Sequence, residues 1–315
     1  MRVCLMIEGQ EWVSWEQWLA LAECCERTGF EGLFRSDHYM GLGDQPGGSL
    51  DAWATLAALA ARTERIRLGT MVSPTTFRHP SVLGRAATTV DHISGGRAEL
   101  GLGAGWYERE HHAFGFPFGP LGERMEVFEE QAEIIVGQWT TESFSYSGRH
   151  YQLEDCDALP RPVQRPHPPV IIGGSGKRRT VEVAVRLGQE YNVVGPTVAE
   201  CRDLRGRMDE ACARHGRDPQ TLVLSAMCTV CVGEDTAQAE ARAQRLVDLG
   251  FEQGDGASVL AENRDTWVCG TIDEAVARLR ELADAGVKRM MLQHLLHDDL
   301  DAVELFGREL VPAVT

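Results

Sequence analysis

Eight short apolar runs alternate regularly with longer segments of helical period along this chain of 315 residues. Nearly all of these runs are apolar throughout, which is typical of parallel strands covered on both faces. Eight strands that are each followed by a helix predict a single α/β domain over residues 1–315, a (β/α)8 TIM barrel. The expected strands are residues 3–7, 32–36, 66–72, 98–103, 169–173, 191–195, 222–232 and 289–295.

The alternative fold is an open doubly wound sheet, which normally carries a phosphate-binding glycine motif after its first strand. Here residues 7–10 (Ile-Glu-Gly-Gln) follow the first strand and form no such motif, so the barrel is favoured. The first helix also has readable ends. Ser14 and Gln17 form a capping-box pattern that opens it, and Gly29 closes it.

Two stretches interrupt the alternation of strands and helices. Residues 140–168 indicate a small hairpin and a proline-rich tether, inserted after the fourth helix. Residues 250–268 form a second, polar insertion near the seventh strand, after the helix that follows it. Connections of this length are frequently functional, so both are predicted to act as lids over the site; the alternative is that they are only decoration.

The composition excludes several classes of protein. Hydrophobic residues make up 43% and charged residues 25%, the balance of a globular protein with a substantial core. The formal net charge of −16 argues against a nucleic acid or an anionic membrane as partner, because its field repels phosphate groups. No apolar run approaches the ~18 residues of a membrane span, and the N-terminus lacks the pattern of a signal peptide. We therefore expect a cytoplasmic protein that acts on a small molecule.

The nine cysteines are scattered, and only Cys228 and Cys231 show a CxxC spacing. They fall in an expected strand, where residues three apart face opposite sides, so they are poorly placed to chelate a metal. A zinc ribbon also needs a second such pair, which this sequence lacks. No metal site is predicted, and the cysteines are interpreted as small buried apolar residues.

In a barrel of this type the catalytic groups lie at the carboxyl ends of the strands. The most reactive pair at these positions is Asp37-His38, because an imidazole with an ordinary pKa near ~6.5 exchanges a proton at neutral pH. The alternative is that Asp37 caps a turn and His38 is an ordinary loop residue. The further candidates at strand ends are Glu8, Val72, Ser73, Ala104, Gly105, Trp106, residues 173–177, Asn192, Gln293 and His294.

Two glycine-rich runs follow expected strands. Residues 101–105 fail the dinucleotide-binding pattern because Trp106 stands where its third glycine is needed. Residues 173–177 (Gly-Gly-Ser-Gly-Lys) precede a helix and, with Arg178 and Arg179, bring three successive cations to its first turn. Free backbone N–H groups at that end favour an anion, whereas cations there are unfavourable by roughly 0.3–1 kcal/mol each. A phosphate site is predicted; the alternative is a solvated basic turn.

Five longer stretches carry a family resemblance. They are FEGLFRSDHY (30–39), IRLGTMVSPTTFRHP (66–80), SGGRAELGLGAGWYEREHHAFGFPF (94–118), LGERMEVFEE (121–130) and PPVIIGGSGKRRT (168–180). On these residues the chain resembles the luciferase-like monooxygenase superfamily, and within it the F420-dependent oxidoreductases. The similarity extends over essentially the whole chain, and the segments 78–80 and 103–111 together are specific to the group.

The resemblance implies a barrel, usually a homodimer, that binds a flavin or the deazaflavin coenzyme F420 at its mouth. Asp37 and His38 would flank the ring, with His38 as the proton donor or acceptor near the reacting carbon. The Met71–Val72 bond matches a bulge in which a non-prolyl cis peptide presses against the ring face. The other implied contacts are to the ribityl chain from Ala104, Gly105 and Arg109, and to the phosphate from Gly174, Ser175, Gly176, Arg179 and Thr180.

The sequence departs from the sugar-phosphate dehydrogenases that belong to the same group. They carry Glu where Trp106 stands and Trp where Leu42 stands, and both positions belong to their catalytic set. We therefore do not expect oxidation of a sugar phosphate. Glu108 and Glu110 are alternative sources of a carboxylate, although both are explained equally well as surface residues of a helix.

Three functions are compatible with the sequence. The leading hypothesis is hydride transfer between F420 and a small organic substrate, with His38 supplying a proton. The second keeps the fold and uses reduced FMN with O₂, as a flavin monooxygenase. The third is a non-catalytic flavin carrier, against which the intact Asp37-His38 pair and phosphate segment argue.

Overall fold

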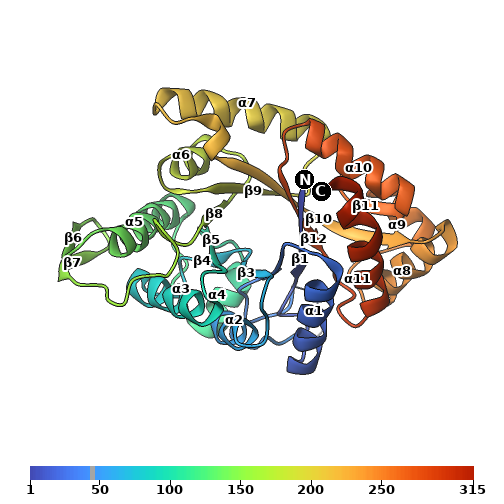
Figure 1. The fold of residues 1–315 in the computed structure, drawn as a ribbon, viewed down its shortest axis with the longest axis horizontal. Coiled ribbons are helices and arrows are strands. Elements are labelled where there is room, and N and C mark those ends of the chain that lie inside the picture. The colour runs from blue at the N-terminus through green and yellow to red at the C-terminus, as the bar shows by residue number, and fades with distance from the viewer. Residues whose placement is uncertain (43–46) are drawn as a thin grey trace.

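The computed structural model describes residues 1–42 and 47–315, and its centre is a closed parallel barrel (Figure 1). Each barrel strand pairs with the next one around the barrel, and the last, β12, pairs back with β1. All eight expected strands are present, which confirms the predicted (β/α)8 barrel. The barrel strands are β1 (Arg2–Ile7), β2 (Gly32–Arg35), β3 (Arg67–Thr70) with its continuation β4 (Ser73–Pro74), β5 (Ala98–Gly103), β8 (Val170–Gly173), β9 (Glu190–Val194), β10 (Val223–Gly233) and β12 (Arg289–Gln293).

Helices surround the barrel and cover its outer face (Figure 1). The capping box at Ser14 is present, and Gly29 ends the first helix in the left-handed region with a φ of 87°. Within residues 1–42 and 47–315, no helix is long and apolar enough to cross a membrane. The helices are α1 (Trp15–Thr28), α2 (Ala52–Ala60), α3 (Pro80–Ser94), α4 (Glu108–Phe114), α5 (Leu121–Thr140), α6 (Arg178–Leu187), α7 (Val198–Arg214), α8 (Thr236–Asp248), α9 (Gly256–Glu262), α10 (Ile272–Asp284), α11 (Leu300–Leu305) and α12 (Val311–Val314), with a 3₁₀ turn at Pro219–Thr221 and a π-helical turn at Phe306–Leu310.

The first insertion forms the expected hairpin, made of β6 (Phe144–Ser147) and β7 (Gln152–Cys156). The hairpin lies against α5 at the periphery of the molecule (Figure 1). Its turn is fixed by Glu130 of α5, whose carboxylate accepts hydrogen bonds from three successive backbone N–H groups, those of residues 149–151. The role of this segment as a lid stays a prediction.

The second insertion is more ordered than its polar sequence indicates. Residues 256–262 form α9, which packs on α8, and the insertion then enters a further strand, β11 (Val268–Thr271). β11 pairs in parallel with the last residues of β10. The sequence pattern does not predict this strand, because it is only four residues long and contains Gly270 in the left-handed region.

The two cysteines of the CxxC spacing lie in different parts of the interior. Cys228 belongs to the main hydrophobic core, whereas Cys231 packs with Trp267 in a separate cluster beneath the second insertion. This separation is what the alternation of side chains along a strand predicts. All nine cysteines are free thiols.

The lumen of the barrel contains a sulfur-rich cluster of side chains. Alternate residues of a strand face the same side, so Cys4 and Met6 of β1 both point inward. Because every second residue of a strand faces the lumen, the residue two positions after each inward-facing one also faces the lumen and lies nearer its carboxyl end. The members of the cluster are Cys4, Met6, Phe34, Met71, Ile171, Met227 and Met291, with Val72 packed against them.

A buried ion cluster fills the opposite, amino-terminal end of the lumen. Arg289 of β12 is 1% exposed and pairs with Glu99 of β5 at 2.7 Å and with Glu190 of β9 at 3.0 Å. Its Nε atom lies 2.7 Å from a carboxylate oxygen of Glu31, which precedes β2. Because β5 and β9 are not neighbours of β12 in the barrel, these contacts cross the lumen.

This cluster shifts the pKa values of its carboxyl groups in opposite directions. Burial raises the pKa of Glu99, but the charge and hydrogen bonds of Arg289 and Arg67 outweigh burial and lower it to about 2. For Glu190, burial outweighs the attraction of Arg289, and the pKa is raised. Since Glu99 titrates lower in the folded chain than in the unfolded one, its contribution to stability is complete above about pH 4.5 and is lost as the pH falls towards about 2.

We expect Arg289→Met to lower the free energy of unfolding by about 3–5 kcal/mol, because it leaves buried carboxylates without their counter-charge. Arg2 is the matched control, since it pairs with the same Glu31 at 2.9 Å but with a side chain that is 45% exposed. Arg2→Met is expected to cost less than about 1 kcal/mol. Equilibrium urea unfolding measures both losses, and equal losses would contradict this account of the buried cluster.

Candidate active site

The carboxyl ends of the barrel strands meet at the open end of the lumen, which we call the mouth. His38 lies there in the loop after β2, and its Nδ1 is 2.7 Å from Oε2 of Glu110 in α4. Glu110 is completely buried, and its other oxygen accepts hydrogen bonds from the backbone N–H groups of Tyr39 and Met40. The described part of the chain offers no hydrogen-bond partner to Nε2 of His38.

The pKa of His38 is raised above its ordinary value. Burial acts in the opposite direction, but the hydrogen bond and negative charge of Glu110, together with the charges of Glu8 and Asp37, outweigh it. A raised pKa means that the pair stabilises the fold fully below the ordinary histidine pKa, and that this contribution is lost as the pH rises through the pKa of the folded state. His38 therefore keeps more of its imidazolium form at neutral pH than an exposed histidine does.

Asp37 lies in a buried ion pair rather than free in the mouth. Its Oδ2 accepts hydrogen bonds at 2.6 Å from Ser73 Oγ and at 2.6 Å from Arg78 Nη1. Arg78 also donates to Asp51 at 2.8 Å and to the Tyr39 hydroxyl at 2.9 Å, so one guanidinium links three groups. This network fixes the loop that carries His38.

The peptide bond between Met71 and Val72 is cis, as the resemblance implies. Val72 packs against the sulfur-rich cluster and is approached closely by the backbone of neighbouring strands. A Cβ atom placed on Gly103 would lie 2.7 Å from Cγ2 of Val72, and one on Gly173 would lie 3.0 Å from Cγ1. Glycine is therefore required at both positions for the strands to pass beside this bond.

The loop before α6 gathers four of the five predicted phosphate residues. Tyr191 organises it, because its hydroxyl accepts a hydrogen bond from Gly176 N at 2.8 Å and lies 2.9 Å from Thr180 Oγ1. A Cβ atom on Gly174 would lie 2.5 Å from that hydroxyl. Ser175 is exposed, and the first turn of α6 has no side-chain cap, so its backbone N–H groups are open to an anion.

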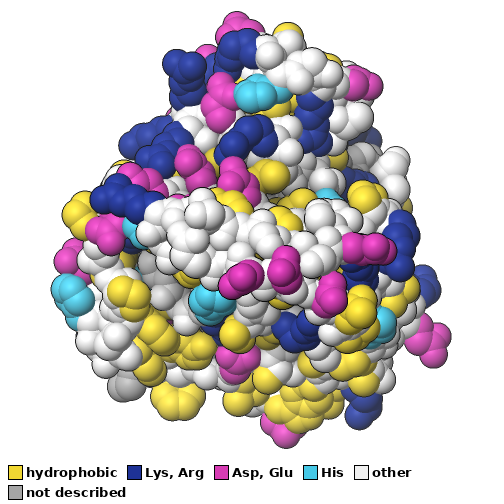
Figure 2. Space-filling view, turned by 90° about the vertical axis from the view of Figure 1, so that its left-hand side faces the viewer, with side chains coloured by type: hydrophobic (Ala, Val, Ile, Leu, Met, Phe, Trp, Pro, Cys, Tyr) yellow, Lys and Arg dark blue, Asp and Glu magenta, His cyan; other side chains and the backbone are white. Residues whose placement is uncertain are grey.

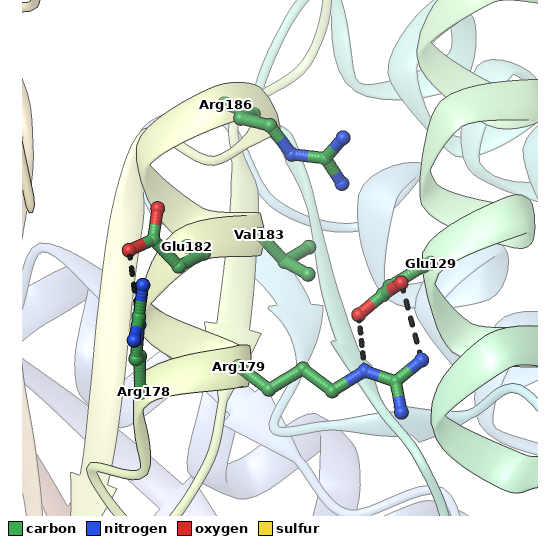
Figure 3. Close-up of a pocket in the computed structure, with 6 residues that line it drawn as sticks. All are labelled: Glu129, Arg178, Arg179, Glu182, Val183 and Arg186. Atoms are coloured by element: carbon green, nitrogen blue, oxygen red, sulfur yellow. Dashed lines mark hydrogen bonds and ion pairs between the residues drawn. The ribbon is translucent and has the colours of Figure 1, made fainter. Parts of the chain in front are cut away.

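The fifth predicted phosphate residue, Arg179, is directed elsewhere. Its guanidinium pairs with Glu129 of α5 at 2.6 Å across a groove between α5 and α6 (Figure 3). This groove has a volume of about 450 Å³ and is lined by Glu129, Arg178, Arg179, Glu182, Val183 and Arg186. Figure 2 shows that basic and acidic side chains are mixed on this side of the molecule. Arg179 would have to leave Glu129 before it could contact a phosphate in the loop.

The loop after β5 forms an aromatic wall beside His38. The Trp106 ring is 63% exposed and stacks on Tyr107 with centroids 5.3 Å apart, and both rings meet His38 edge-on. Ala104 and Gly105 lead into this wall, and Gly105 has a φ of 77°. Arg109, on the first turn of α4, is exposed and free of ion pairs with described residues.

Two neighbouring candidates at the end of β12 face opposite sides. Gln293 points into the mouth, where it accepts a hydrogen bond from Thr229 at 2.7 Å and donates one to Glu8 at 2.5 Å. His294 points outward and packs edge-on against Phe306, with ring centroids 5.5 Å apart. Burial lowers the pKa of His294 to about 4, so it is a neutral core residue. The prediction of His294 as a site residue is wrong.

Three residues of this site are only weakly indicated by the sequence. Glu110 is explained equally well by the sequence as a helix-surface residue, and only the position of α4 against the β2 loop reveals its burial. Tyr191 lies within an apolar strand, where the sequence pattern predicts a residue of the hydrophobic core. Arg78 stands in a segment that carries the family resemblance, which was the one signal available for it.

Comparisons with known proteins show the family and the fold of this chain. The family model described as luciferase-like monooxygenase matches residues 3–289. The chain is 25% identical to the FMNH(2)-dependent dimethylsulfone monooxygenase of Pseudomonas putida, over 93% of this chain and 86% of that protein. It is 27% identical to the F420-dependent glucose-6-phosphate dehydrogenase of Microbacterium testaceum, over 91% of this chain and 90% of that protein. The crystal structure of a monooxygenase from Streptomyces bottropensis has the same fold, with a TM-score of 0.85 at 23% identity over 100% of both chains.

We expect Glu110→Gln to lower the pKa of His38, because the substitution removes the main group that raises it while keeping the side-chain shape. The ring carbon shifts of labelled histidine, followed by NMR against pH, report this pKa. Glu108→Gln is the control, since Glu108 is on the same helix but exposed and 3.9 Å from His112. An unchanged His38 pKa in Glu110→Gln, or an equal change in both variants, would show that Glu110 does not control it.

Proposed function

This chain belongs to the luciferase-like monooxygenase family, and we propose that it is an oxidoreductase that transfers a hydride between coenzyme F420 and a small organic substrate. The observation that carries the proposal is the His38–Glu110 pair. Hydride transfer at carbon needs a proton to be exchanged at a neighbouring oxygen or nitrogen, and an imidazole with a raised pKa is suited to that exchange.

The residues present fit a phosphorylated cofactor. The uncapped first turn of α6, the Ser175 hydroxyl and Lys177 would hold its phosphate, and the Tyr191 hydroxyl leaves no room for a side chain at Gly174. Ala104, Gly105 and Arg109 would line the ribityl chain. A bound deazaflavin would supply the carbon that accepts or donates the hydride, whereas reduced FMN would supply reactivity towards O₂.

In the proposed reaction His38 exchanges the proton at its Nε2, because Glu110 holds the proton at Nδ1. Asp37 orients the loop instead of exchanging a proton, since Ser73 and Arg78 both donate to it. The sulfur-rich cluster beneath the mouth excludes water from the lumen side. The aromatic wall of Trp106 and Tyr107 shields His38 on another side.

The second candidate is a monooxygenase that uses reduced FMN and O₂. The relative from Pseudomonas putida favours it, because that protein is FMNH(2)-dependent and is as extensively similar as the F420-dependent one. The same phosphate loop serves both cofactors. We place F420 first on the segments 78–80 and 103–111, which together are specific to the group that the sequence resembles.

We further propose that the protein acts as a homodimer in the cytoplasm. The homodimer is what the resemblance implies. The insertions at 140–168 and 250–268 are proposed as the source of substrate contacts at the rim. Among the described residues nothing groups into a metal site, and the proposed chemistry needs none.

We expect F420 to bind with micromolar affinity and FMN to bind at least about tenfold more weakly, a gap of about 1.4 kcal/mol. Parallel titrations that follow tryptophan fluorescence measure both. Preference for FMN would overturn the F420 proposal and direct attention to oxygen consumption. Absence of turnover with either reduced cofactor across many substrates would support the carrier alternative.

We expect His38→Ala to retain cofactor affinity and to lower kcat by about 10²–10⁴, the usual contribution of a positioned acid or base. The assay is the absorbance change of F420 with a panel of small alcohols and amines, using the members that the wild type turns over. His112→Ala is the control, because His112 lies on α4 with an exposed side chain. Unchanged turnover in His38→Ala, with cofactor still bound, would show that the proton comes from another group.

A further inference from the structure

One buried carboxylate of the mouth has no use in the proposed reaction. Glu8 follows β1, and the inward positions Cys4 and Met6 of that strand place its side chain in the lumen above the sulfur-rich cluster. Glu8 is 8% exposed. A carboxylate buried to this degree is unfavourable by several kcal/mol unless hydrogen bonds and an opposite charge compensate.

The hydrogen bonds around Glu8 hold it as an acceptor. Gln10 Nε2 donates to one of its oxygens at 2.9 Å, and Gln293 Nε2 donates to the other at 2.5 Å. The oxygen of each amide accepts from a hydroxyl, that of Ser36 for Gln10 and that of Thr229 for Gln293. Both amide nitrogens are thereby directed at Glu8, and each oxygen of Glu8 faces one N–H donor.

The other buried carboxylates of the mouth each have a cation of their own. Asp37 pairs with Arg78 at 2.6 Å, and Glu110 pairs with His38 at 2.7 Å. Glu8 and Asp37 act on the charge of His38 as well, so one imidazolium faces three carboxylates. Arg35 is the other cation on which Glu8 acts. Its Nε and Nη2 donate to Ser36 O, Ser49 Oγ and Leu50 O, its buried Nη1 has no hydrogen-bond partner among the described residues, and it forms no ion pair with Glu8.

We propose that Glu8 is a specificity-determining residue that binds the protonated amine of the substrate, an organic ammonium ion with a planar ring. An ammonium group gives Glu8 a direct ion-pair partner, which it lacks among the described residues, and donates hydrogen bonds to its carboxylate. Phosphate and carboxylate substrates are repelled by the same charge. This inference rests on the proposed function, because it takes the mouth around His38 as the substrate site.

The aromatic wall supplies the second part of this substrate class. Trp106 presents an exposed ring, stacked on Tyr107, at 5.9 Å from the ring of His38. Exposed indole rings bind planar apolar groups by stacking, and they also attract cations. Trp106 contacts the ring of His38, and the charge of Glu8 acts on the same ring, so the proposal assigns the planar ring and the amine to one ligand beside the proposed proton donor.

The test compares three probes of the same size and different charge: benzylamine, benzyl alcohol and benzoate. Ligand-observed NMR titrations of the wild-type protein, with and without its cofactor, give their dissociation constants at neutral pH. We expect benzylamine to bind about tenfold more tightly than benzyl alcohol, the size of one charge-assisted hydrogen bond, and benzoate to bind most weakly. Equal affinities of benzylamine and benzyl alcohol would overturn the proposal.

Glu8→Gln is expected to abolish the preference for benzylamine while leaving the affinity for benzyl alcohol unchanged. Glu11→Gln is the matched control, because Glu11 is a partly buried carboxylate that accepts from Leu42 N and lies nearby in the same chain segment. It should keep the preference. If Glu8→Gln retains the preference, or weakens the cofactor instead of the amine, the proposal is wrong; if it fails to fold, the order of the three probes on the wild type decides alone.

The test of the role of Glu8 and the test of the cofactor proposal can fail independently of each other. A wild-type protein that binds neither F420 nor FMN but prefers benzylamine refutes the cofactor proposal and supports the role of Glu8. A protein that binds F420 and shows no preference for the amine refutes only the role of Glu8.

Discussion

The contacts of Arg289 across the lumen determine which end of this barrel is available for chemistry. One guanidinium joins carboxylates from β5, β9 and the segment before β2, and so fills the amino-terminal end with paired charged groups. The sulfur-rich cluster lies above it. Water and ligands then have access only from the carboxyl end, where the strand-end loops carry His38, Trp106 and the phosphate loop.

The same alternation of side chains that builds these layers also distributes the polar groups of the mouth. Thr229, Gln293 and Glu8, on three adjacent strands, form one hydrogen-bonded row, and Ser36 extends it through Gln10. The row is a rigid floor, because each amide is fixed by a hydroxyl on one side and a carboxylate on the other. His38 and Glu110 come instead from a loop and a helix, so their position depends on how α4 packs.

This distinction explains what the sequence alone can predict. Eight apolar runs and their flanking caps predict the barrel because strand burial is a local property of each run. Strand ends likewise indicate the mouth, but side-chain direction at a strand end changes with every residue, which is why Gln293 belongs to the site and His294 does not. Glu110 and Arg179 depend on tertiary contacts with the β2 loop and with α5, and no periodicity in the sequence encodes these.

The groups around the proposed cofactor site also bear on how the protein distinguishes F420 from FMN. The loop before α6 recognises a phosphate through backbone N–H groups, a feature that F420 and FMN share, and relatives of equal similarity use either one. The two cofactors also differ in their rings, because the deazaflavin has a carbon at the reactive ring position, so the ring end of the site is one place where the protein can distinguish them. There the chain places a protonatable His38 over a floor that is negative at Glu8. Under the proposed role of Glu8, a positively charged substrate is accommodated at this end of the site, whichever ring is bound.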